Sequence, residues 1–353
     1  MQTEFEFRQH LLEVTRGYRL SQVLITCAEL GVFEALGSGA ASSEELAFRL
    51  EVHPLALARL LEAAVALGWV EKQSRSYLMS PVAAACLSFE SPFYLGNYLK
   101  REGAFYRRWS NLTQAVRTGQ RPEENKKDEV VNTNWVQDFE MALYDIARTA
   151  APAVAVALGP ILTLPQRTAA EQPVRVLDVG GGHGAYSIAL AEKYPDLEAV
   201  IFELPAAAEV AQSIRAKSRV ADRVTVQAGD FKVNDLGSGF DLVLLFGVLV
   251  SETAEGAVAL LGKVHQALRA DGQVVIRGSY LNSDHNGPID ANLFDLHMLL
   301  SNSAGGAHTL NELTEWLAAS GFEAPETLNL PAPEQSSLIL ARKKVSDSPN
   351  SGE

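Results

Sequence analysis

The chain is poor in cysteine and in basic side chains. Its 353 residues include only two cysteines, Cys27 and Cys86, and 43 acidic residues against 30 Lys and Arg give a net charge of −13. Two cysteines supply neither a disulfide framework nor the ligand spacing of a zinc site, and they fit a reducing compartment. The acidic balance disfavours nucleic acid as a partner, because phosphates bind to basic faces.

Long hydrophobic runs are also missing. The longest stretch without charge, residues 150–165, contains prolines and is too short to span a bilayer. Glu4, Glu6 and Arg8 interrupt any apolar signal segment at the N-terminus. The acids and histidines show no spacing that places two metal ligands on one helix face. We therefore expect a soluble, cytoplasmic protein without a metal site and without a membrane or nucleic-acid partner.

The N-terminal part has the pattern of helices followed by a two-stranded wing. Apolar residues recur with helical spacing over residues 1–36. Further helices are expected at 42–50, beginning with a Ser42–Glu45 capping box, and at 54–67. Residues 69–71 and 77–79 flank a polar turn and predict two short strands. This order is that of a winged helix.

A winged helix suggests DNA binding, but the helix that would enter the groove is unsuited to it. Residues 54–67 carry one base, Arg59, and one acid, Glu62, and are otherwise almost all Leu and Ala. Such an apolar helix is better suited to burial in a core or in a subunit interface.

The most informative stretch is residues 177–184, Leu-Asp-Val-Gly-Gly-Gly-His-Gly. It follows an apolar strand and precedes a predicted helix at 185–194, which is the beginning of a Rossmann-type nucleotide site. Glycine is required there because the backbone turns sharply and approaches the ligand closely. Glu203 ends the next predicted strand, where a carboxylate can accept the hydroxyls of a ribose. The chain is therefore expected to bind a cofactor that contains adenosine.

Strands and helices alternate after residue 173, which predicts an α/β domain with a parallel sheet covered on both faces. We expect strands at 174–179, 199–203, 223–228, 241–246 and 273–278. We expect helices near 185–194, 206–217, 255–269 and 310–319, the last beginning with a Thr309–Glu312 capping box. Two final strands, 326–330 and 337–341, are expected to pair antiparallel at the sheet edge.

Three features favour S-adenosylmethionine over a nicotinamide dinucleotide, although Gly180 and Gly182 fit both patterns. Asp178 can reach the amino group of an amino-acid moiety, whereas it would repel a pyrophosphate. Asp230 and Phe231 follow the third strand, at the expected place of an adenine. The antiparallel terminal hairpin is typical of S-adenosylmethionine enzymes.

From about residue 15 to residue 343 the chain resembles the small-molecule O-methyltransferases of the caffeate, hydroxyindole and polyketide-tailoring group. The motifs that carry the resemblance occur in the family's order: Leu177 to Gly184, Glu203-Leu204-Pro205, Gly229-Asp230-Phe231, Asp295 to Leu299, and Gly305-Gly306 followed by Thr309. The resemblance implies a class I methyltransferase domain, a helical winged-helix dimerisation domain and an intertwined homodimer. It implies an S-adenosylmethionine site at Asp178, Gly180, Gly182, Glu203, Asp230 and Phe231.

Three domain segments are predicted on this basis. Residues 1–165 form a dimerisation and substrate-capping domain, residues 166–345 form the cofactor-binding catalytic domain, and residues 346–353 form a polar, disordered tail.

The chain departs from the family where the resemblance would place the catalytic base. Val250 stands in the place of the histidine that removes the proton from the acceptor hydroxyl. The acids that orient this histidine would lie at Arg277-Gly278-Ser279 and Ala307-His308, where no acid occurs. Because valine cannot accept a proton, the reaction needs no base, the base lies elsewhere, or the reaction is not methyl transfer.

Three polar residues are candidates for acid–base or binding roles: His297, which lies on a helix predicted at 293–300, His308 and Arg277. The resemblance implies an acceptor pocket for a small metabolite, and its expected wall is Phe105, Trp109, Phe139, Met141, Val250 and Met298.

We expect a methyltransferase that acts on an oxygen or carbon of an aromatic or polyketide-like metabolite. The first alternative is an enzyme that binds S-adenosylmethionine without transferring its methyl group, such as a cyclase, pericyclase, hydroxylase or decarboxylase. The second is a binding or regulatory protein built on the winged helix.

Overall fold

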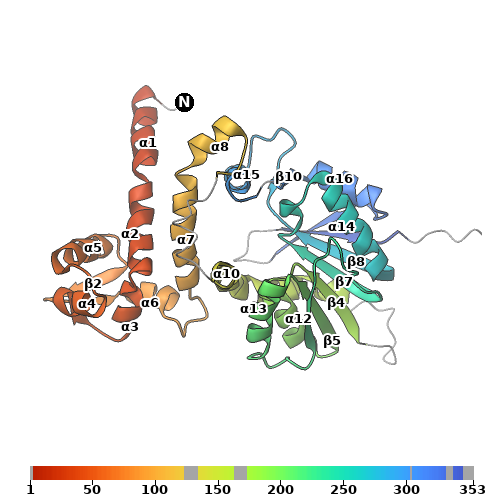
Figure 1. The fold of residues 1–353 in the computed structure, drawn as a ribbon, viewed down its shortest axis with the longest axis horizontal. Coiled ribbons are helices and arrows are strands. Elements are labelled where there is room, and N and C mark those ends of the chain that lie inside the picture. Colours follow the sequence, from red (N-terminus) through yellow and green to blue (C-terminus); the bar gives the residue numbers. More distant parts are fainter. Residues whose placement is uncertain (1–2, 123–133, 163–172, 303, 331–336, 345–353) are drawn as a thin grey trace, which may run out of the picture. The chain divides into compact units, whose positions relative to one another are not determined.

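The computed structural model describes residues 3–122, 134–162, 173–302, 304–330 and 337–344 (Figure 1). The chain forms two compact units. The first contains Met1–Arg107 and Met141–Ile146, and the second contains Arg108–Glu140 and Ala147–Glu353. The predicted domain boundary at residues 165 and 166 and the predicted tail at 346–353 lie outside the described residues.

The first unit is mainly helical. Its elements are α1 (Glu4–Arg16), α2 (Tyr18–Glu29), α3 (Val32–Gly37), β1 (Ala41–Ser42), α4 (Ser43–Arg49), α5 (Pro54–Ala66), β2 (Val70–Gln73), β3 (Ser76–Met79), α6 (Pro81–Leu87) and most of α7 (Gly96–Trp109). The capping box expected at Ser42 and Glu45 is present, and β2 pairs antiparallel with β3 as expected. Strand β1, which the sequence did not indicate, adds a third strand beside β3.

The helical region expected over residues 1–36 is divided into three helices. Gly17 separates α1 from α2, and Gly31, with a φ of +75°, precedes α3. Glycine tolerates this left-handed backbone, which would strain other residues. The unit closes around buried side chains of α2 to α6, including Cys27, Phe33 and Leu61.

The second unit contains the sheet. Its helices are α8 (Leu112–Thr118), most of α10 (Trp135–Ala157), α11 (Gly159–Leu162), α12 (Ala185–Lys193), α13 (Pro205–Arg215), α14 (Ala254–Ala267), α15 (Ile289–Ser301) and α16 (Leu310–Ala319), with a 3-10 turn at Leu249–Ser251. Its strands are β4 (Val174–Val179), β5 (Leu197–Glu203), β6 (Val224–Ala228), β7 (Phe240–Phe246), β8 (Leu268–Arg277), β9 (Tyr280–Leu281), β10 (His308–Thr309), β11 (Glu326–Asn329) and β12 (Ser337–Arg342).

The seven-stranded sheet has the order β11-β12-β8-β7-β4-β5-β6. Strands β4 to β8 are parallel, whereas β12 is antiparallel to both β8 and β11. The predicted parallel sheet with an antiparallel terminal hairpin is therefore confirmed. Strand order reverses at β4, the place where open α/β sheets bind ligands beyond the strand ends.

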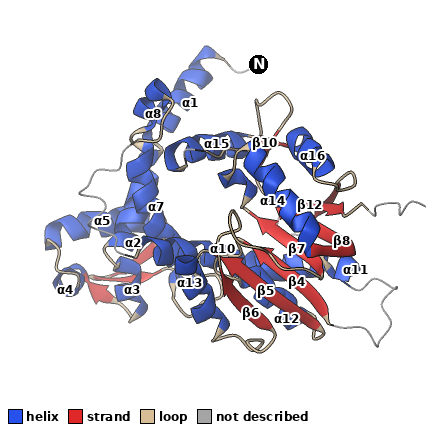
Figure 2. Cartoon of the chain, turned by 45° about the vertical axis from the view of Figure 1, so that its right-hand side comes forward, coloured by secondary structure: helices blue, strands red, loops and turns tan. Residues whose placement is uncertain are grey.

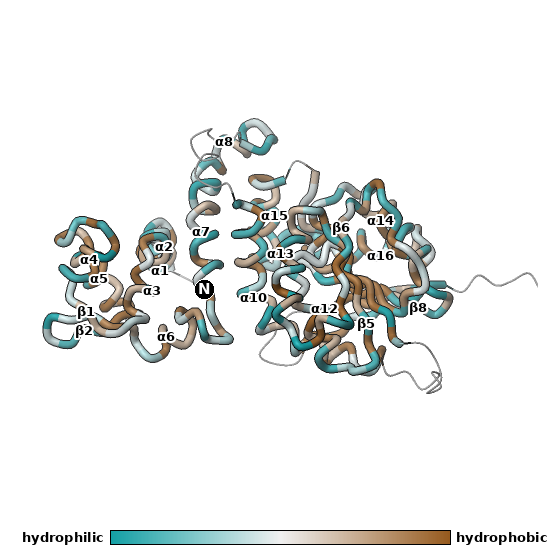
Figure 3. The backbone as a smooth tube through the Cα atoms, turned by 60° about the horizontal axis from the view of Figure 1, so that its bottom comes forward, coloured by the Kyte–Doolittle hydropathy of each residue, from teal (hydrophilic) through white to brown (hydrophobic). Residues whose placement is uncertain are grey.

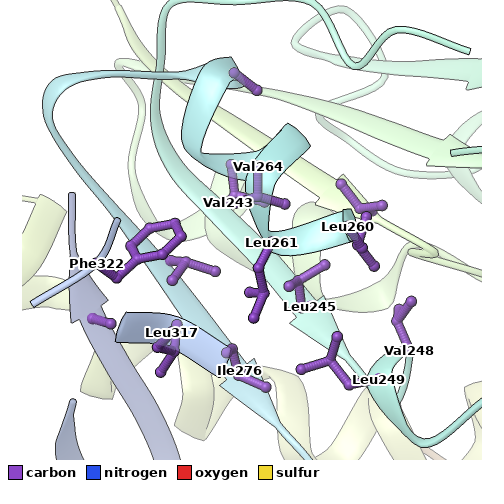
Figure 4. Close-up of a cluster of buried hydrophobic side chains, with 14 of the residues drawn as sticks. Val243, Leu245, Val248, Leu249, Leu260, Leu261, Val264, Ile276, Leu317 and Phe322 are labelled. Carbon is purple, nitrogen blue, oxygen red and sulfur yellow. The ribbon is translucent and has the colours of Figure 1, made fainter. Parts of the chain in front are cut away.

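Helices cover both faces of the sheet (Figure 2). The strands themselves are strongly apolar, as the brown segments of the tube in Figure 3 show. Alternate strand residues such as Val243, Leu245 and Ile276 pack against α14 and against Leu317 of α16, in the cluster drawn in Figure 4. Because side chains alternate between faces along a strand, the buried neighbours Leu242 and Leu244 point to the other face. Burial on both faces holds the strand ends that form the site.

Two elements differ from the sequence prediction. Helix α15 begins at Ile289 rather than near Leu293, and strand β8 begins at Leu268, directly after α14. The short strands β9 and β10, which form a parallel pair, were not predicted. Strands of two residues carry no periodicity, so only their tertiary pairing defines them.

Candidate active site

The glycine turn after β4 has the geometry that its sequence predicts. Gly180, Gly182 and Gly184 have φ angles of +65°, +48° and +73°. A Cβ atom on Gly180 would lie 2.6 Å from Cγ2 of Val248, and one on Gly184 would lie 2.4 Å from Cδ1 of Ile201. Side chains are therefore excluded on both conformational and steric grounds. The N–H groups of Gly182, Gly184 and Ala185 are bonded within the chain, to Glu203, Gly181 and His183, and these bonds hold the turn where α12 begins.

Glu203 connects the end of β5 to this turn. Its Oε2 accepts a hydrogen bond from the Gly182 N–H at 2.9 Å, and its Oε1 accepts one from the Leu204 N–H at 2.7 Å. The side chain is half-buried. Its carboxylate therefore lies at the carboxyl edge of the sheet, where the sequence predicted a ribose-binding acid.

Asp230 and Phe231 follow β6 at the same edge. The Asp230 carboxylate accepts a hydrogen bond from the Lys232 N–H at 2.8 Å, and the Asp230 N–H donates to Asn234 Oδ1 at 2.9 Å. The Lys263 ammonium holds the carbonyl of Phe231 at 2.5 Å. These contacts fix the loop, and its predicted contact with an adenine stays a prediction.

Asp178 lies beneath the glycine turn. It is 1% exposed, and its Oδ2 accepts a hydrogen bond from the Ser187 hydroxyl at 2.7 Å. A Cβ on Gly181 would lie 2.7 Å from the Asp178 carboxyl carbon. Burial, with a smaller contribution from Glu203, raises the pKa of Asp178 to about 7. In this position Asp178 supports the turn from below, and its predicted contact with an amino group stays a prediction.

Glu140 of α10 is a site residue that sequence reasoning missed. It is 7% exposed, and its Oε2 would lie 2.4 Å from a Cβ on Gly182. Burial and the nearby charge of Glu203 raise the pKa of Glu140 to about 7, although an N–H of His183 favours the charged form. No local motif marks Glu140, because the glycine turn lies about forty residues further along the chain.

His183 is part of the turn and remains neutral. It is 7% exposed, and its Nδ1 accepts a hydrogen bond from the Ala185 N–H at 3.1 Å. Burial lowers the pKa of His183 to about 4. The ring therefore helps to begin α12 and adds no charge to the site.

The three segments that the resemblance assigns to the base and its supports do meet. Val250, Arg277, Gly278 and His308 are among the residues around one crevice of about 10 Å³. Among the described residues that line it, none is Asp or Glu. The His308 Nε2 lies 3.3 Å from the Leu249 carbonyl, so it donates there, and the ring packs edge-on against Trp316 at 4.7 Å.

Arg277 extends from the end of β8 toward the beginning of α12. Its guanidinium donates a hydrogen bond to the hydroxyl of Tyr186 and lies 5.6 Å from the centre of that ring. Tyr186 packs edge-on against Phe246 with ring centres 4.9 Å apart. A permanent cation is thus held on the same edge of the sheet as the glycine turn.

His297 of α15 has two aromatic rings beside it. The ring centres of Trp109 and Phe294 are 6.5 Å and 6.3 Å from that of His297, with interplanar angles of 26° and 25°. Its Nδ1 accepts a hydrogen bond from the Trp109 indole N–H at 3.3 Å, and its Nε2 lies 3.3 Å from the Ser301 hydroxyl. Because Nδ1 is an acceptor here, the neutral ring carries its proton on Nε2.

Comparison with known proteins identifies the family. One family model, described as an O-methyltransferase domain, matches residues 163–323, and another, an O-methyltransferase dimerisation domain, matches residues 12–88. The N,N-dimethyltransferase OxyT of Streptomyces rimosus is 31% identical to this chain, and the match covers 75% of the chain and 76% of that protein. The chain belongs to the O-methyltransferase family. The predicted methyltransferase fold, function and use of S-adenosylmethionine are thereby confirmed.

Other relatives of this methyltransferase modify oxygen or carbon. The 3-hydroxy-5-methyl-1-naphthoate 3-O-methyltransferase of Streptomyces sahachiroi is 29% identical over 94% of each chain. The L-tyrosine C(3)-methyltransferase of Streptomyces lavendulae is 34% identical over 48% of this chain and 47% of that protein. Human N-acetylserotonin methyltransferase in complex with S-adenosylmethionine has the same fold, with a TM-score of 0.81 at 23% identity over 98% of this chain and 99% of that one.

The methyltransferase has a cleft beside α15 that the sequence did not predict. It has a volume of about 660 Å³. Its lining residues come from α15 and from the segments after α8 and α15: Gly119, Gln120, Arg121, Asp295, Leu296, Leu299, Asn302 and Gly305. Asp295 is one of these lining residues, and its Oδ1 accepts a hydrogen bond from the Ala307 N–H at 2.8 Å.

The remaining predicted wall residues of the methyltransferase fall into both units. Phe139 packs against Trp135 with ring centres 5.8 Å apart, and Met298 is 9% exposed on α15, both in the second unit. Phe105, with the Arg101 guanidinium 4.8 Å from its ring centre, and the half-buried Met141 belong to the first unit.

Among the described residues, no group of three or more His, Cys, Asp or Glu could hold a metal ion. None of the described helices is long and apolar enough to cross a bilayer.

Proposed function

We propose that this protein methylates a hydroxyl oxygen or an electron-rich carbon of a small aromatic or polyketide-like acceptor, without a histidine base. The observation that carries the proposal is the crevice where Val250 meets Arg277, since a cation and an aliphatic side chain occupy the place of a base and its acids. The naphthoate relative supports an aromatic acceptor.

The chain's own residues suit this chemistry. The glycine turn and Glu203 hold S-adenosylmethionine, which supplies an electrophilic methyl group. The Arg277 guanidinium stabilises an acceptor anion, and this lowers the pKa of a phenol or enol so that water can remove the proton. Positioning of the two reactants then supplies the remaining acceleration.

We assign binding roles to the histidines. His297, whose ring is nearly parallel to those of Trp109 and Phe294, forms part of a flat wall for the acceptor ring, and its Nε2 proton can donate to an acceptor oxygen. His308 holds the Leu249 carbonyl and shapes the crevice. Phe139 and Met298 of the second unit belong to the same proposed acceptor wall.

We also propose that the enzyme is a homodimer. Helix α1 buries none of its residues within the chain, and Phe7, Leu11 and Val14 are exposed at one helical face by 52%, 51% and 64%. An apolar face of this kind marks an interface. The dimerisation model at residues 12–88 supports self-association.

The proposed winged helix, α4 and α5 with β2 and β3, then serves the dimer rather than DNA. Its second helix, α5, is apolar and carries the single base Arg59.

Product analysis tests the proposed activity. The purified protein is incubated with trideuteromethyl S-adenosylmethionine and a panel of hydroxynaphthoates and hydroxyanthraquinones, and products are detected by mass spectrometry. We expect a trideuteromethyl product and an equal amount of S-adenosylhomocysteine for at least one acceptor. No methylated product with any member of the panel contradicts the proposed acceptor class.

Two substitutions test the absence of a base. We expect Val250→His to raise kcat/KM by less than tenfold for the best acceptor, since a required base contributes roughly 10²–10⁴-fold. We expect Arg277→Gln, but not Arg277→Lys, to move the pH of half-maximal rate upward, because the acceptor anion loses its cation. A 100-fold gain from Val250→His would show that the acceptor needs a base.

A further inference from the structure

Glu140 combines deep burial with an unused hydrogen-bonding atom. The residue is 7% exposed, and its Oε2 is buried without a hydrogen-bond partner. A buried carboxylate oxygen without a donor is costly, so such a group in a native site points to a ligand that supplies the donor.

The position of this oxygen identifies the site that it serves. The nearest atom to a Cβ built on Gly182 is Glu140 Oε2, at 2.4 Å. Gly182 also donates its N–H to Glu203 at 2.9 Å. Helix α10 therefore brings a second carboxylate to the turn at Gly182, whereas Asp178 lies at Gly181 and already accepts a hydrogen bond from Ser187.

Charge narrows the choice of ligand group. Burial is the main cause of the raised pKa of Glu140, and the nearby charge of Glu203 adds to it, so the two carboxylates repel each other when both are charged. A ribose hydroxyl would donate a hydrogen bond to Glu140 but would leave this repulsion in place. A sulfonium would neutralise charge but has no proton to donate. An ammonium group does both, since it carries three donors and a positive charge.

We propose that Glu140 binds the α-ammonium group of the amino-acid moiety of S-adenosylmethionine, the role that the sequence suggested for Asp178. The inference rests on the cofactor site of the proposed function and adds a residue to it. In this assignment Glu203 binds the ribose of S-adenosylmethionine, and Glu140 binds the ammonium group at the other end of the same molecule.

Three ligands distinguish the binding roles of Glu140 and Glu203. S-adenosylhomocysteine contains ribose and ammonium, its deamino analogue lacks the ammonium, and 5′-methylthioadenosine lacks the whole amino-acid part. Affinities are measured by calorimetry for the full-length wild type, Glu140→Gln and the matched control Glu203→Gln. Circular dichroism and thermal unfolding verify that each variant is folded.

Loss of the charged hydrogen bond between Glu140 and the ammonium group predicts how the affinities for the three ligands change. We expect Glu140→Gln to weaken S-adenosylhomocysteine about 10- to 100-fold and to change 5′-methylthioadenosine less than about twofold. Glu203→Gln is expected to weaken both, because both contain the ribose. The wild type should bind the deamino analogue about as weakly as Glu140→Gln binds S-adenosylhomocysteine.

Two results would overturn the assignment. One is wild-type affinity of Glu140→Gln for S-adenosylhomocysteine, and the other is an equal loss of 5′-methylthioadenosine. If Glu140→Gln does not fold, wild-type protein that binds the deamino analogue as tightly as S-adenosylhomocysteine also overturns it. Failure of the wild type to bind any of the three ligands would instead contradict the cofactor site itself.

Discussion

Gly180 shows how one backbone angle controls the site. Its φ of +65° directs the chain from β4 into the turn, and its missing side chain leaves room for Val248. Val248 is 7% exposed and β-branched, so it cannot move aside easily. Glycine is therefore required at position 180 for two reasons, its positive φ and the close approach of Val248.

We expect Gly180→Ala to lower the free energy of unfolding by about 1–3 kcal/mol and to weaken S-adenosylhomocysteine binding by more than tenfold. Gly237→Ala is the control, because Gly237 has a φ of +76° but no atom closer than 3.7 Å to an added Cβ. It should lose stability through strain alone and keep its affinity. Urea unfolding and calorimetry measure the two effects, and equal affinity losses in both variants would contradict the packing argument.

Asp178 predicts how stability depends on pH. Its pKa is raised from 3.8 to about 7 in the folded chain, chiefly by burial. Between these values the folded state binds a proton that the unfolded state has released. Asp178 therefore contributes to the free energy of unfolding at low pH, and this contribution is lost as the pH rises toward 7.

Asp178→Asn should remove this dependence, since asparagine can still accept from the Ser187 hydroxyl. From pH 5 to pH 8, the cofactor-free variant is expected to lose less stability than wild type, by on the order of 2 kcal/mol. Urea unfolding at several pH values measures the slope, with exposed Asp222→Asn as the control. Parallel slopes for wild type and Asp178→Asn would contradict the raised pKa.

At the scale of elements, helix α16 illustrates a local signal that survives folding. Thr309 accepts a hydrogen bond from the Glu312 N–H at 3.1 Å, and Glu312 accepts from the Thr309 N–H at 2.7 Å. This is the capping box that the sequence predicts. It fixes the beginning of a helix whose Leu313, Trp316 and Leu317 pack on the sheet.

We expect Thr309→Ala to lower the free energy of unfolding by about 1 kcal/mol through loss of the cap. Thr314→Ala removes an exposed hydroxyl that bonds only to Leu310 within the same helix, and it should change stability by less than about 0.5 kcal/mol. Chemical denaturation compares the two variants. A larger loss in Thr314→Ala than in Thr309→Ala would contradict the role of the cap.

At the scale of the whole molecule, α1 is an element that the single chain does not explain. Its apolar face contacts too little of its own chain to be buried, and exposure of such a face to water is unfavourable. In the homodimer that we propose, association of two copies removes this cost, because the exposed residues are buried between the copies.

We expect light scattering with size-exclusion chromatography to give the mass of a dimer for wild type. Leu11→Glu places a charge in the apolar face and should shift the protein toward monomer by at least tenfold in dissociation constant. Glu13→Lys changes a charge that lies about 120° around the helix from this face, and it should leave the dimer intact. A dimer that persists in Leu11→Glu, or a monomeric wild type, would exclude this face as the interface.

The sequence alone determined the features that depend on near neighbours along the chain. The strand–glycine–helix unit, the acid at the end of β5, the alternation of strands and helices and two capping boxes follow from local backbone and burial requirements. Each uses residues within one or two elements, so its pattern is visible in the sequence. Recognition of the family followed from these motifs in order.

Only the tertiary structure decided which distant side chains meet. Arg277 reaches Tyr186, Trp109 donates to His297, and Glu140 reaches the glycine turn across long separations in the chain. The tertiary structure also placed the Asp178 carboxylate beneath the turn, where it is buried. Strand alternation and the fold of the turn determine on which side of the backbone this carboxylate lies. Such contacts depend on how the helices pack on the sheet, and this packing leaves no periodic pattern in the sequence. The sequence therefore indicated the cofactor, whereas the fold determined which side chains surround its site.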